Sequence, residues 1–115
     1  MKISYLFAGL VVTDRDQAAE WYERLLGQPA YLYPNEAEAA WRLGESVSLY
    51  LLADPPRAGR GVLTLVVEDL DAERDLLRAR GIVAGPVEEV GEAGRKCVIP
   101  DPDGNEIALV ELRPG

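Results

Sequence analysis

The side chains that could do chemistry in this chain are mainly carboxylates, because its 115 residues include no histidine and one cysteine. Ser-His-Asp and Cys-His catalysis, and every metal site that needs histidine, are therefore excluded. A single cysteine also rules out an internal disulfide and a cysteine zinc site. That cysteine, Cys97, follows Arg95 and Lys96, but no base adjoins it in the sequence, and we interpret it as a small core residue.

The charge balance is acidic, since 12 Lys and Arg stand against 20 Asp and Glu and give a formal net charge of −8. This charge repels nucleic acid phosphates and anionic membrane surfaces, so we expect neither a nucleic acid nor a membrane as partner. It keeps a small domain soluble, and it would also favour a cationic small molecule. No glycine-rich segment has the spacing of a phosphate-binding loop.

Length and composition predict that the elements positioning these residues form one domain, covering residues 1–115. An apolar content of 48% is typical of a globular chain. No apolar run approaches the roughly 18 residues of a membrane span. The first residues do not resemble a signal peptide, because polar side chains interrupt them and no cleavage site follows. We therefore expect a cytoplasmic protein.

An internal repeat predicts two half-chain modules. The segment Leu10–Asp16 recurs as Leu65–Asp71, at an offset of 55 residues. In each copy an apolar run ends at an aspartate that can cap a helix, and the helix closes with a glycine, Gly27 in the first copy and Gly81 in the second. The modules are expected at about 1–53 and 61–115, with a linker rich in proline and glycine at about 54–60.

Each module is predicted to contain one strand, one helix and three further strands. The residues expected to face inward are Ala18, Trp21, Tyr22, Leu25 and Leu26 in the first helix and Ala72, Leu76, Leu77 and Ala79 in the second, at about Leu70–Arg80. The strands expected after the helices are Ala30–Tyr33, Ala39–Leu43, Val47–Leu52, Val83–Val87, Lys96–Ile99 and Glu106–Leu112. Turns are expected between them, the first at Pro34-Asn35.

The fold class that follows is α+β, with two βαβββ modules in tandem. A module of this size offers one helix over one small sheet, so we expect the two sheets to join edge to edge into a curved mixed sheet with the helices on its outer face. Side chains alternate along a strand, so the face opposite the helices should form a concave cup, which is the natural place for a ligand.

The sequence resembles the vicinal oxygen chelate superfamily, which includes glyoxalase I, extradiol dioxygenases and bleomycin resistance proteins. The resemblance covers essentially the whole chain. The segments that carry it are Leu10–Asp14 leading to Trp21–Gly27, Val67–Asp71 leading to Leu77–Gly81, and Asp101–Ile107. The last of these, which begins with the turn sequence DPDGN, is the most specific.

The resemblance implies four positions at which metal-dependent members hold an ion with His, Gln or Glu. Counting from Asp14, from Asp69 and from the glycine of the DPDGN turn identifies the matching positions here. They are Phe7, Val62, Ala108 and, as two alternatives, Ser48 or Tyr50. None of these side chains is a useful ligand for a divalent ion, so we expect neither a metal nor a cofactor.

We expect the cup to bind a small molecule by burial and stacking, in the manner that the metal-free bleomycin resistance branch implies. The expected lining is Phe7, Ser48, Tyr50, Val62, Thr64 and Ala108, with Trp41, Tyr31 or Tyr33 as further aromatic candidates. The resemblance implies sequestration of a cationic or aromatic compound such as an antibiotic, by a homodimer. The alternatives are a metal-independent isomerase or lyase with Glu106 or another carboxylate as general base, and a regulatory module whose cup is filled by its own side chains.

Overall fold

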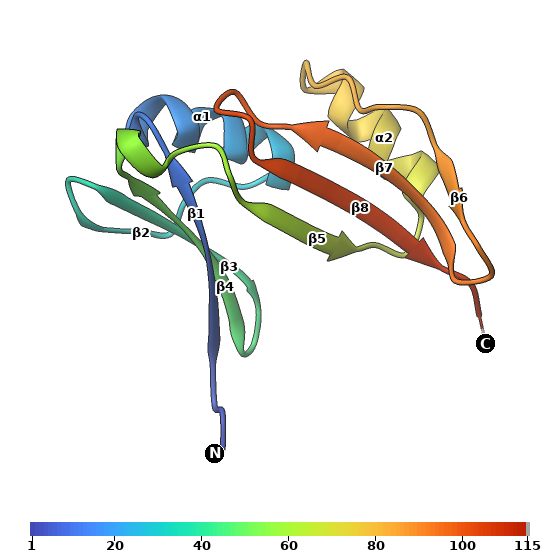
Figure 1. The fold of residues 1–115 in the computed structure, drawn as a ribbon, viewed down its shortest axis with the longest axis horizontal. Helices are drawn as coiled ribbons and strands as arrows, with labels where there is room; N and C mark the ends of the chain where they lie inside the picture. The colour runs from blue at the N-terminus through green and yellow to red at the C-terminus, as the bar shows by residue number, and fades with distance from the viewer. Residues whose placement is uncertain (115) are drawn as a thin grey trace.

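The computed structural model of the chain describes residues 1–114 and contains two modules of the same design (Figure 1). Its elements, in chain order, are β1 (Leu6–Val12), α1 (Arg15–Leu26), β2 (Leu32–Asn35), β3 (Glu38–Gly44), β4 (Val47–Ala53), the short 3-10 helix η1 (Pro55–Arg57), β5 (Val62–Val66), α2 (Leu70–Ala79), β6 (Glu88–Val90), β7 (Gly94–Pro100) and β8 (Glu106–Leu112). This order confirms the predicted α+β class and the two tandem βαβββ modules.

Each module forms one four-stranded mixed sheet. The strand order is β1-β4-β3-β2 in the first sheet and β5-β8-β7-β6 in the second. In both sheets the first strand runs parallel to the last, whereas the other neighbours are antiparallel. The two helices are the only ones longer than a single turn within residues 1–114, and neither is long and apolar enough to cross a membrane.

The sheets do not share a hydrogen-bonded edge within the described part of the chain, which differs from the expected edge-to-edge joining. The first strands of the two modules, β1 and β5, are each an edge strand of their own sheet and diverge in Figure 1. At the end of β1 the carbonyl of Val11 accepts hydrogen bonds from the backbone N–H of Gly59 in the linker (3.2 Å) and from Asn105 Nδ2 (2.9 Å). That carbonyl is therefore not available to a neighbouring strand.

The predicted helix ends are confirmed. Asp14 and Asp69 each accept a hydrogen bond from the backbone N–H three residues further on, at 2.9 and 3.0 Å. These side chains satisfy donors that an N-terminus leaves free. Gly27 and Gly81 follow the two helices with φ of 73° and 86°, a conformation that favours glycine.

The inward face of α1 matches its prediction, because Ala18, Tyr22 and Leu25 are buried while Trp21 and Leu26 are half-buried. The prediction for α2 was largely wrong. Its residues Ala72, Leu76 and Ala79 are exposed.

The inward face of α2 is instead a single row of residues. Leu70 and Leu77 are buried in it, and Arg74 stands between them. The guanidinium of Arg74 donates to the carbonyl of Gly85 at 3.0 Å. An arginine stem thus fills a place where the apolar periodicity required a leucine.

The predicted strand Val83–Val87 was wrong, since the edge strand of the second sheet is β6, at Glu88–Val90. Pro86 lacks an N–H and cannot complete a ladder. Gly85 does lie along β7, where its N–H donates to the carbonyl of Val98 at 3.0 Å. The backbone there is so close that a Cβ on Gly85 would stand 2.8 Å from that oxygen.

The first turn was also misplaced, because Pro34 and Asn35 belong to β2 and the chain reverses at Glu36-Ala37. The Asn35 side chain makes this turn by accepting from the backbone N–H of Ala37 at 2.8 Å. The remaining predicted strands are found to within two residues.

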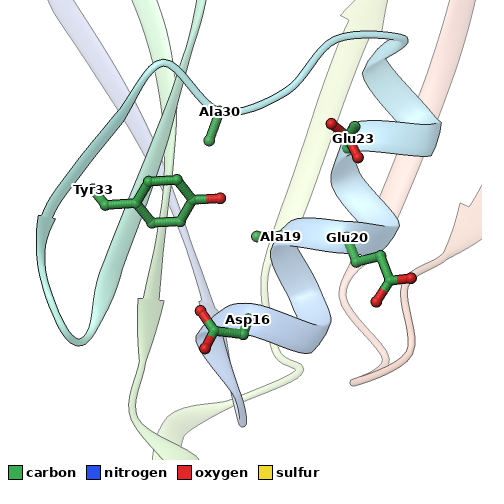
Figure 2. A pocket seen from close by; sticks show the side chains of 6 residues that line it. All are labelled: Asp16, Ala19, Glu20, Glu23, Ala30 and Tyr33. Atoms are coloured by element: carbon green, nitrogen blue, oxygen red, sulfur yellow. The ribbon is translucent and has the colours of Figure 1, made fainter.

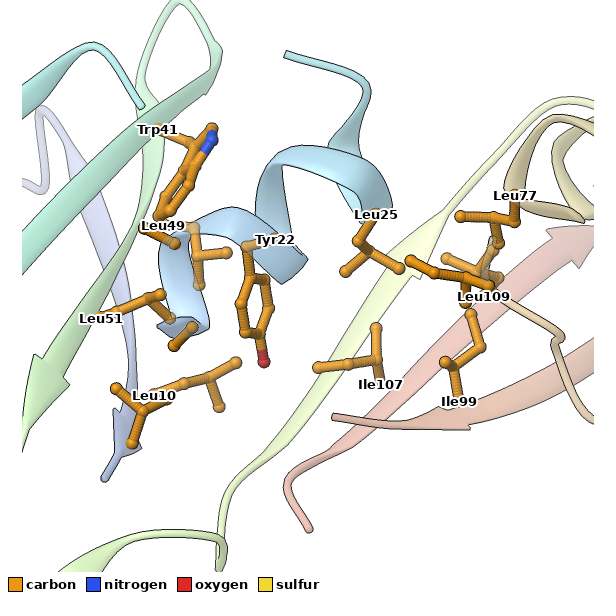
Figure 3. Close-up of a cluster of buried hydrophobic side chains, with 14 of the residues drawn as sticks. Leu10, Tyr22, Leu25, Trp41, Leu49, Leu51, Leu77, Ile99, Ile107 and Leu109 are labelled. Atoms are coloured by element: carbon orange, nitrogen blue, oxygen red, sulfur yellow. The ribbon is translucent and has the colours of Figure 1, made fainter. Parts of the chain in front are cut away.

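One hydrophobic core runs through both modules (Figure 3). Tyr22 and Leu25 of α1 lie between the two sheets. The buried side chains on either side of them are Leu10, Trp41, Leu49 and Leu51 from the first sheet and Ile99, Ile107 and Leu109 from the second. The helix of the first module therefore packs against the sheet of the second as well as its own.

The DPDGN turn between β7 and β8 links the two modules through the side chains of Asp101 and Asn105, which are both buried. Asp101 accepts from Tyr22 Oη (2.7 Å), from Asn105 Nδ2 (2.8 Å) and from two backbone N–H groups of its own turn. Asn105 Oδ1 accepts from the N–H of Gly61 (2.7 Å), while its Nδ2 also donates to Val11. The motif is thus a structural junction with its buried polar groups satisfied.

Candidate functional site

Strand alternation places the predicted ligand-binding residues opposite the helices. In the first sheet Leu10 and Leu49 enter the core, so Phe7, Ser48 and Tyr50 lie on the other face. In the second sheet Ile107 and Leu109 enter the core. The residues on the opposite face there are Val62, Thr64, Glu106 and Ala108. We call these two surfaces the cup faces.

The strand register decides which residue of the first module corresponds to Ala108. Ala108 is paired with Thr64, two residues beyond Val62. In the first sheet, the residue two positions beyond Phe7 is Gly9, and Gly9 is paired with Tyr50. Ser48, which is paired with Phe7, corresponds instead to Glu106, which is paired with Val62. Of the two alternatives left by the sequence, Tyr50 is therefore the fourth position.

An aromatic cluster occupies the cup face of the first sheet. The rings of Tyr5 and Phe7 have centroids 4.9 Å apart, and those of Phe7 and Tyr50 are 6.4 Å apart in an edge-to-face arrangement. The hydroxyl groups of Tyr5 and Ser48 are hydrogen bonded at 2.6 Å, and Ser48 is fully buried beneath them. Phe7 is 56% exposed, so the cluster offers an open aromatic surface.

Gly9 and Tyr5 take part in this cluster although they were not in the predicted site. The Tyr50 ring lies against the backbone of Gly9, where a Cβ would stand 2.6 Å from the ring. Both residues are in phase with Phe7, so the period-two pattern of the strand contained the signal for them.

The cup face of the second sheet is aliphatic. Val62 and Val66 are 68% and 62% exposed, Thr64 and Glu106 are exposed, and Ala108 is buried. The Glu106 side chain has no hydrogen-bond partner within residues 1–114, and it is open to solvent. It therefore lacks the dry surroundings and the paired group that a general base usually has.

Two of the further aromatic candidates lie away from the cup faces. Trp41 is fully buried in the core, where its Nε1 donates to the carbonyl of Gln28 at 2.9 Å. The prediction failed because alternation in β3 directs this position toward α1. Tyr33 lies on the helix side, with the Arg15 guanidinium 5.0 Å from its ring centroid. Only Tyr31 approaches the predicted face, through the guanidinium of Arg42 at 5.2 Å.

Two cavities lie beside α1, and neither is lined by cup-face residues. One, of about 220 Å³, is formed by Asp16, Ala19, Glu20, Glu23, Ala30 and Tyr33 (Figure 2). The other, of about 320 Å³, is formed by Thr13, Asp14, Gln17, Ala18, Trp21, Arg24, Pro102 and Asp103. Neither of these two cavities therefore belongs to the cup faces.

Cys97 is buried in the core of the second module, as the sequence predicted. Burial raises the pKa of its thiol above the ordinary value of 9.0, although the nearby Arg74 acts in the opposite direction. A buried thiol with a raised pKa is a poor nucleophile.

Comparison with models of known protein families identifies the family of this chain. A model of the glyoxalase-like domain matches residues 8–110. The chain belongs to the glyoxalase-like family. This membership confirms the resemblance that the repeated strand-helix segments and the DPDGN turn indicated. No curated protein matches the chain.

Solved structures of related proteins share the fold of this glyoxalase-like chain. A glyoxalase/bleomycin resistance protein from Catenulispora acidiphila is 43% identical, with a TM-score of 0.88 over 95% of this chain and 98% of that one. TnmS3, an antibiotic binding protein from Streptomyces, is 26% identical, with a TM-score of 0.79 over 98% and 99%. A bleomycin-binding protein in complex with bleomycin is 23% identical, with a TM-score of 0.77 over 94% and 98%, which shows the fold alone.

The metal that glyoxalase-like enzymes of this superfamily use does not fit the residues of this chain. The four matched positions hold Phe7, Tyr50, Val62 and Ala108, which supply no nitrogen, thiolate or carboxylate. Across residues 1–114, His, Cys, Asp and Glu form no cluster of three or more that could hold an ion. No chemical step is therefore derived through a metal.

Proposed function

We propose that this glyoxalase-like chain binds a flat aromatic small molecule, without a metal and without transforming it, between the cup faces of two copies. The observation that carries the proposal is the aromatic cluster of Tyr5, Phe7 and Tyr50. Two of its members, Phe7 and Tyr50, occupy positions that the resemblance matched to metal ligands. Rings in offset or edge-to-face contact stabilise each other by about 0.5–1.5 kcal/mol beyond their buried area. A planar guest could add to such a cluster.

Sequestration is supported by the relatives and by the chemistry of the face. The Streptomyces protein that is 26% identical binds an antibiotic according to its name, and it covers nearly the whole chain. The cup faces offer rings, methyl groups and a few hydroxyls, which suit burial of a ligand more than catalysis. The exposed Glu106 is the one acid among the predicted cup residues and does not favour the alternative of a carboxylate-dependent isomerase.

A homodimer is supported by the apolar surface that one chain leaves open. Phe7, Val62 and Val66 are each more than half exposed, and they lie on the cup faces of the two sheets. Large apolar side chains left this exposed on two faces favour an interface. A second copy related by two-fold symmetry would cover the aromatic face of one chain with the aliphatic face of the other.

A preference for cations rests on long-range charge and on one side chain. The net charge of −8 attracts cations toward the protein, and Glu106 provides a carboxylate at the cup face. Arg42 and Lys96 belong to the same faces, because they are paired with Ser48 and Val110. These two cationic side chains oppose a cationic ligand locally, whereas the net charge of the protein attracts it. We therefore propose a ligand whose aromatic body dominates its affinity and whose positive charge adds to it through that long-range attraction. A cytoplasmic location is part of the same proposal.

The test is titration calorimetry with bleomycin, with planar aromatic cations and with uncharged analogues of the same ring systems. We expect binding of at least one aromatic compound, weakened tenfold or more by Tyr50→Ala and by Phe7→Ala. Tyr33→Ala is the matched control, because the Tyr33 side chain is about as exposed as that of Phe7 but lies on the helix side of the sheet. A panel without heat, or equal losses for all three variants, would contradict the proposal.

Turnover must be tested in the same samples. If a bound compound were converted, and Glu106→Gln abolished the conversion while retaining binding, the isomerase or lyase alternative would replace sequestration.

A further inference from the structure

The larger cavity beside α1 lies at the junction of the two modules and away from the cup faces. One wall comes from the exposed edge of α1, and the other comes from Pro102 and Asp103 in the turn between β7 and β8. Figure 1 shows this turn beside α1. The walls touch where the N–H of Thr13 donates to Asp103 Oδ2 at 3.2 Å. A volume of about 320 Å³ is at the lower end of the range for small-molecule sites.

The lining of this groove is charged at its two ends and apolar in the middle. Asp14 and Asp103 form an acidic end, at the start of α1. Arg24 forms a basic end, in the last turn of the same helix. The half-buried Trp21 lies between them and supplies an indole surface. With a rise of about 1.5 Å per residue, positions 14 and 24 are about 15 Å apart along the axis.

The basic end is available to a ligand and is reinforced from the second module. Among residues 1–114 the Arg24 guanidinium takes part in no ion pair. Arg80 brings a second guanidinium to this end, because its side chain donates to the carbonyls of Arg24 and Leu25. Within the described part of the chain neither guanidinium has a carboxylate partner, which favours an incoming anion.

We propose that this groove binds a short zwitterion with a flat apolar middle, the chemistry of a small aromatic peptide. Its ammonium group lies between Asp14 and Asp103, its apolar body lies on Trp21, and its carboxylate pairs with Arg24. An extended chain reaches at most about 3.3–3.6 Å per residue, so three residues span about 10 Å. The side chains of Asp103 and Arg24 supply the rest of the distance. This site is independent of the proposed cup.

The probe is the tripeptide Gly-Phe-Gly, compared with the same peptide acetylated at its N-terminus and amidated at its C-terminus. Titration calorimetry on the wild-type protein measures both. We expect the free tripeptide to bind at least tenfold more tightly than the blocked one, since blocking removes both charges and keeps the body. Trp emission gives a second signal, because Trp21 is half-buried while Trp41 is enclosed in the core.

Two variants assign the ends of the ligand. Arg24→Gln should weaken binding of the free tripeptide at least fivefold and leave binding of the peptide amidated only at its C-terminus unaffected. Asp103→Asn should also weaken the free tripeptide at least fivefold, and it should leave binding of the peptide acetylated only at its N-terminus unaffected. Arg78→Gln and Asp75→Asn are the matched controls, because both residues are exposed on α2, outside the groove. Far-UV circular dichroism verifies that each variant is folded.

Equal affinity of the free and blocked tripeptides, or no heat from either at millimolar concentration, would overturn the proposal on the wild-type protein alone. Equal losses in the groove variants and in their α2 controls would overturn it as well, because only the net charge would then matter.

Discussion

The Tyr22 hydroxyl, on the helix of the first module, donates a 2.7 Å hydrogen bond to Asp101 in the second. Tyr22 is fully buried, and its ring stands in the core that both modules share. Burial, and then the hydrogen bond to Asp101, raise the pKa of Tyr22 well above its ordinary value of 10.0. The contact thus joins residues 79 positions apart and depends on the protonated phenol.

Stability should therefore fall at alkaline pH in a way that depends on Tyr22. A pKa raised by folding means that the contribution is fully present below pH 10 and is lost as pH rises toward the folded value, since the unfolded chain releases its proton first. Tyr22→Phe should cost about 1 kcal/mol at pH 7 and flatten the fall above pH 10. Urea unfolding across pH 7–11 measures this, with Tyr31→Phe as an exposed control. Parallel pH profiles for wild type and Tyr22→Phe would contradict it.

Asn105→Ala should destabilise the protein more than an exposed asparagine change does. The Asn105 side chain is bonded to the N–H of Gly61, the carbonyl of Val11 and Asp101, and its loss leaves buried polar groups without partners. We expect a cost of about 2–4 kcal/mol in the free energy of unfolding. Asn35→Ala, at an exposed turn, is the control and should cost less than about 1 kcal/mol. Similar costs at both positions would show that the junction contributes little.

Leu77→Ala and Leu76→Ala form a matched pair on α2. Leu77 is 1% exposed and Leu76 is 49% exposed, although the sequence periodicity placed both inward. Deleting the buried side chain should cost about 2–5 kcal/mol, and deleting its neighbour should cost less than about 1 kcal/mol. Chemical denaturation compares the two. Equal costs would mean that another surface covers Leu76.

Val62→Glu and Val66→Glu should shift the protein from dimer to monomer. Each would place a charge on an aliphatic cup face that a second copy is proposed to cover. Sedimentation velocity gives the oligomeric state, and loss of ligand binding should accompany dissociation. Val83→Glu is the control, because Val83 is also strongly exposed but lies in the loop after α2. A wild-type protein that sediments as a monomer would remove the proposed dimer.

Gly9→Ala should disturb ligand binding through Tyr50. The new Cβ would stand 2.6 Å from the Tyr50 ring, so the ring must leave its place. We expect at least a tenfold loss of affinity for any aromatic ligand found, with little change in folding. Gly44→Ala is the control at a strand end, where the nearest atom is a methyl carbon of Val47 at 3.2 Å. Unchanged affinity in Gly9→Ala would show that the position of Tyr50 is unimportant.

The strands and helix ends could be predicted from the sequence wherever local chemistry determines them. Asp14 and Asp69 cap helices through their own side chains, and the repeat placed the two modules in equivalent order. The errors arose where tertiary contacts decide. Arg74 fills an inward position of α2 by reaching the carbonyl of Gly85, which no helical periodicity reveals.

The candidate site was predicted less completely than the fold. Alternation alone could place Phe7, Val62 and Ala108 on one kind of face, but the choice between Ser48 and Tyr50 needed the strand register. The junction of the two modules uses side-chain hydrogen bonds from Asn105 to residues 44 and 94 positions away. Such long-range contacts leave no periodic signal in a single sequence.

The unequal filling of equivalent positions has a geometric consequence for the proposed dimer. Gly9 and Tyr50 in one sheet correspond to Thr64 and Ala108 in the other, so one wall of each cup is made of rings and the opposite wall of methyl groups. A guest would therefore meet two chemically different sides, with one face on the rings and the other on the methyl groups. Two-fold symmetry would relate the two cups of the dimer, so each of two bound guests would lie between a wall of rings from one chain and a wall of methyl groups from the other.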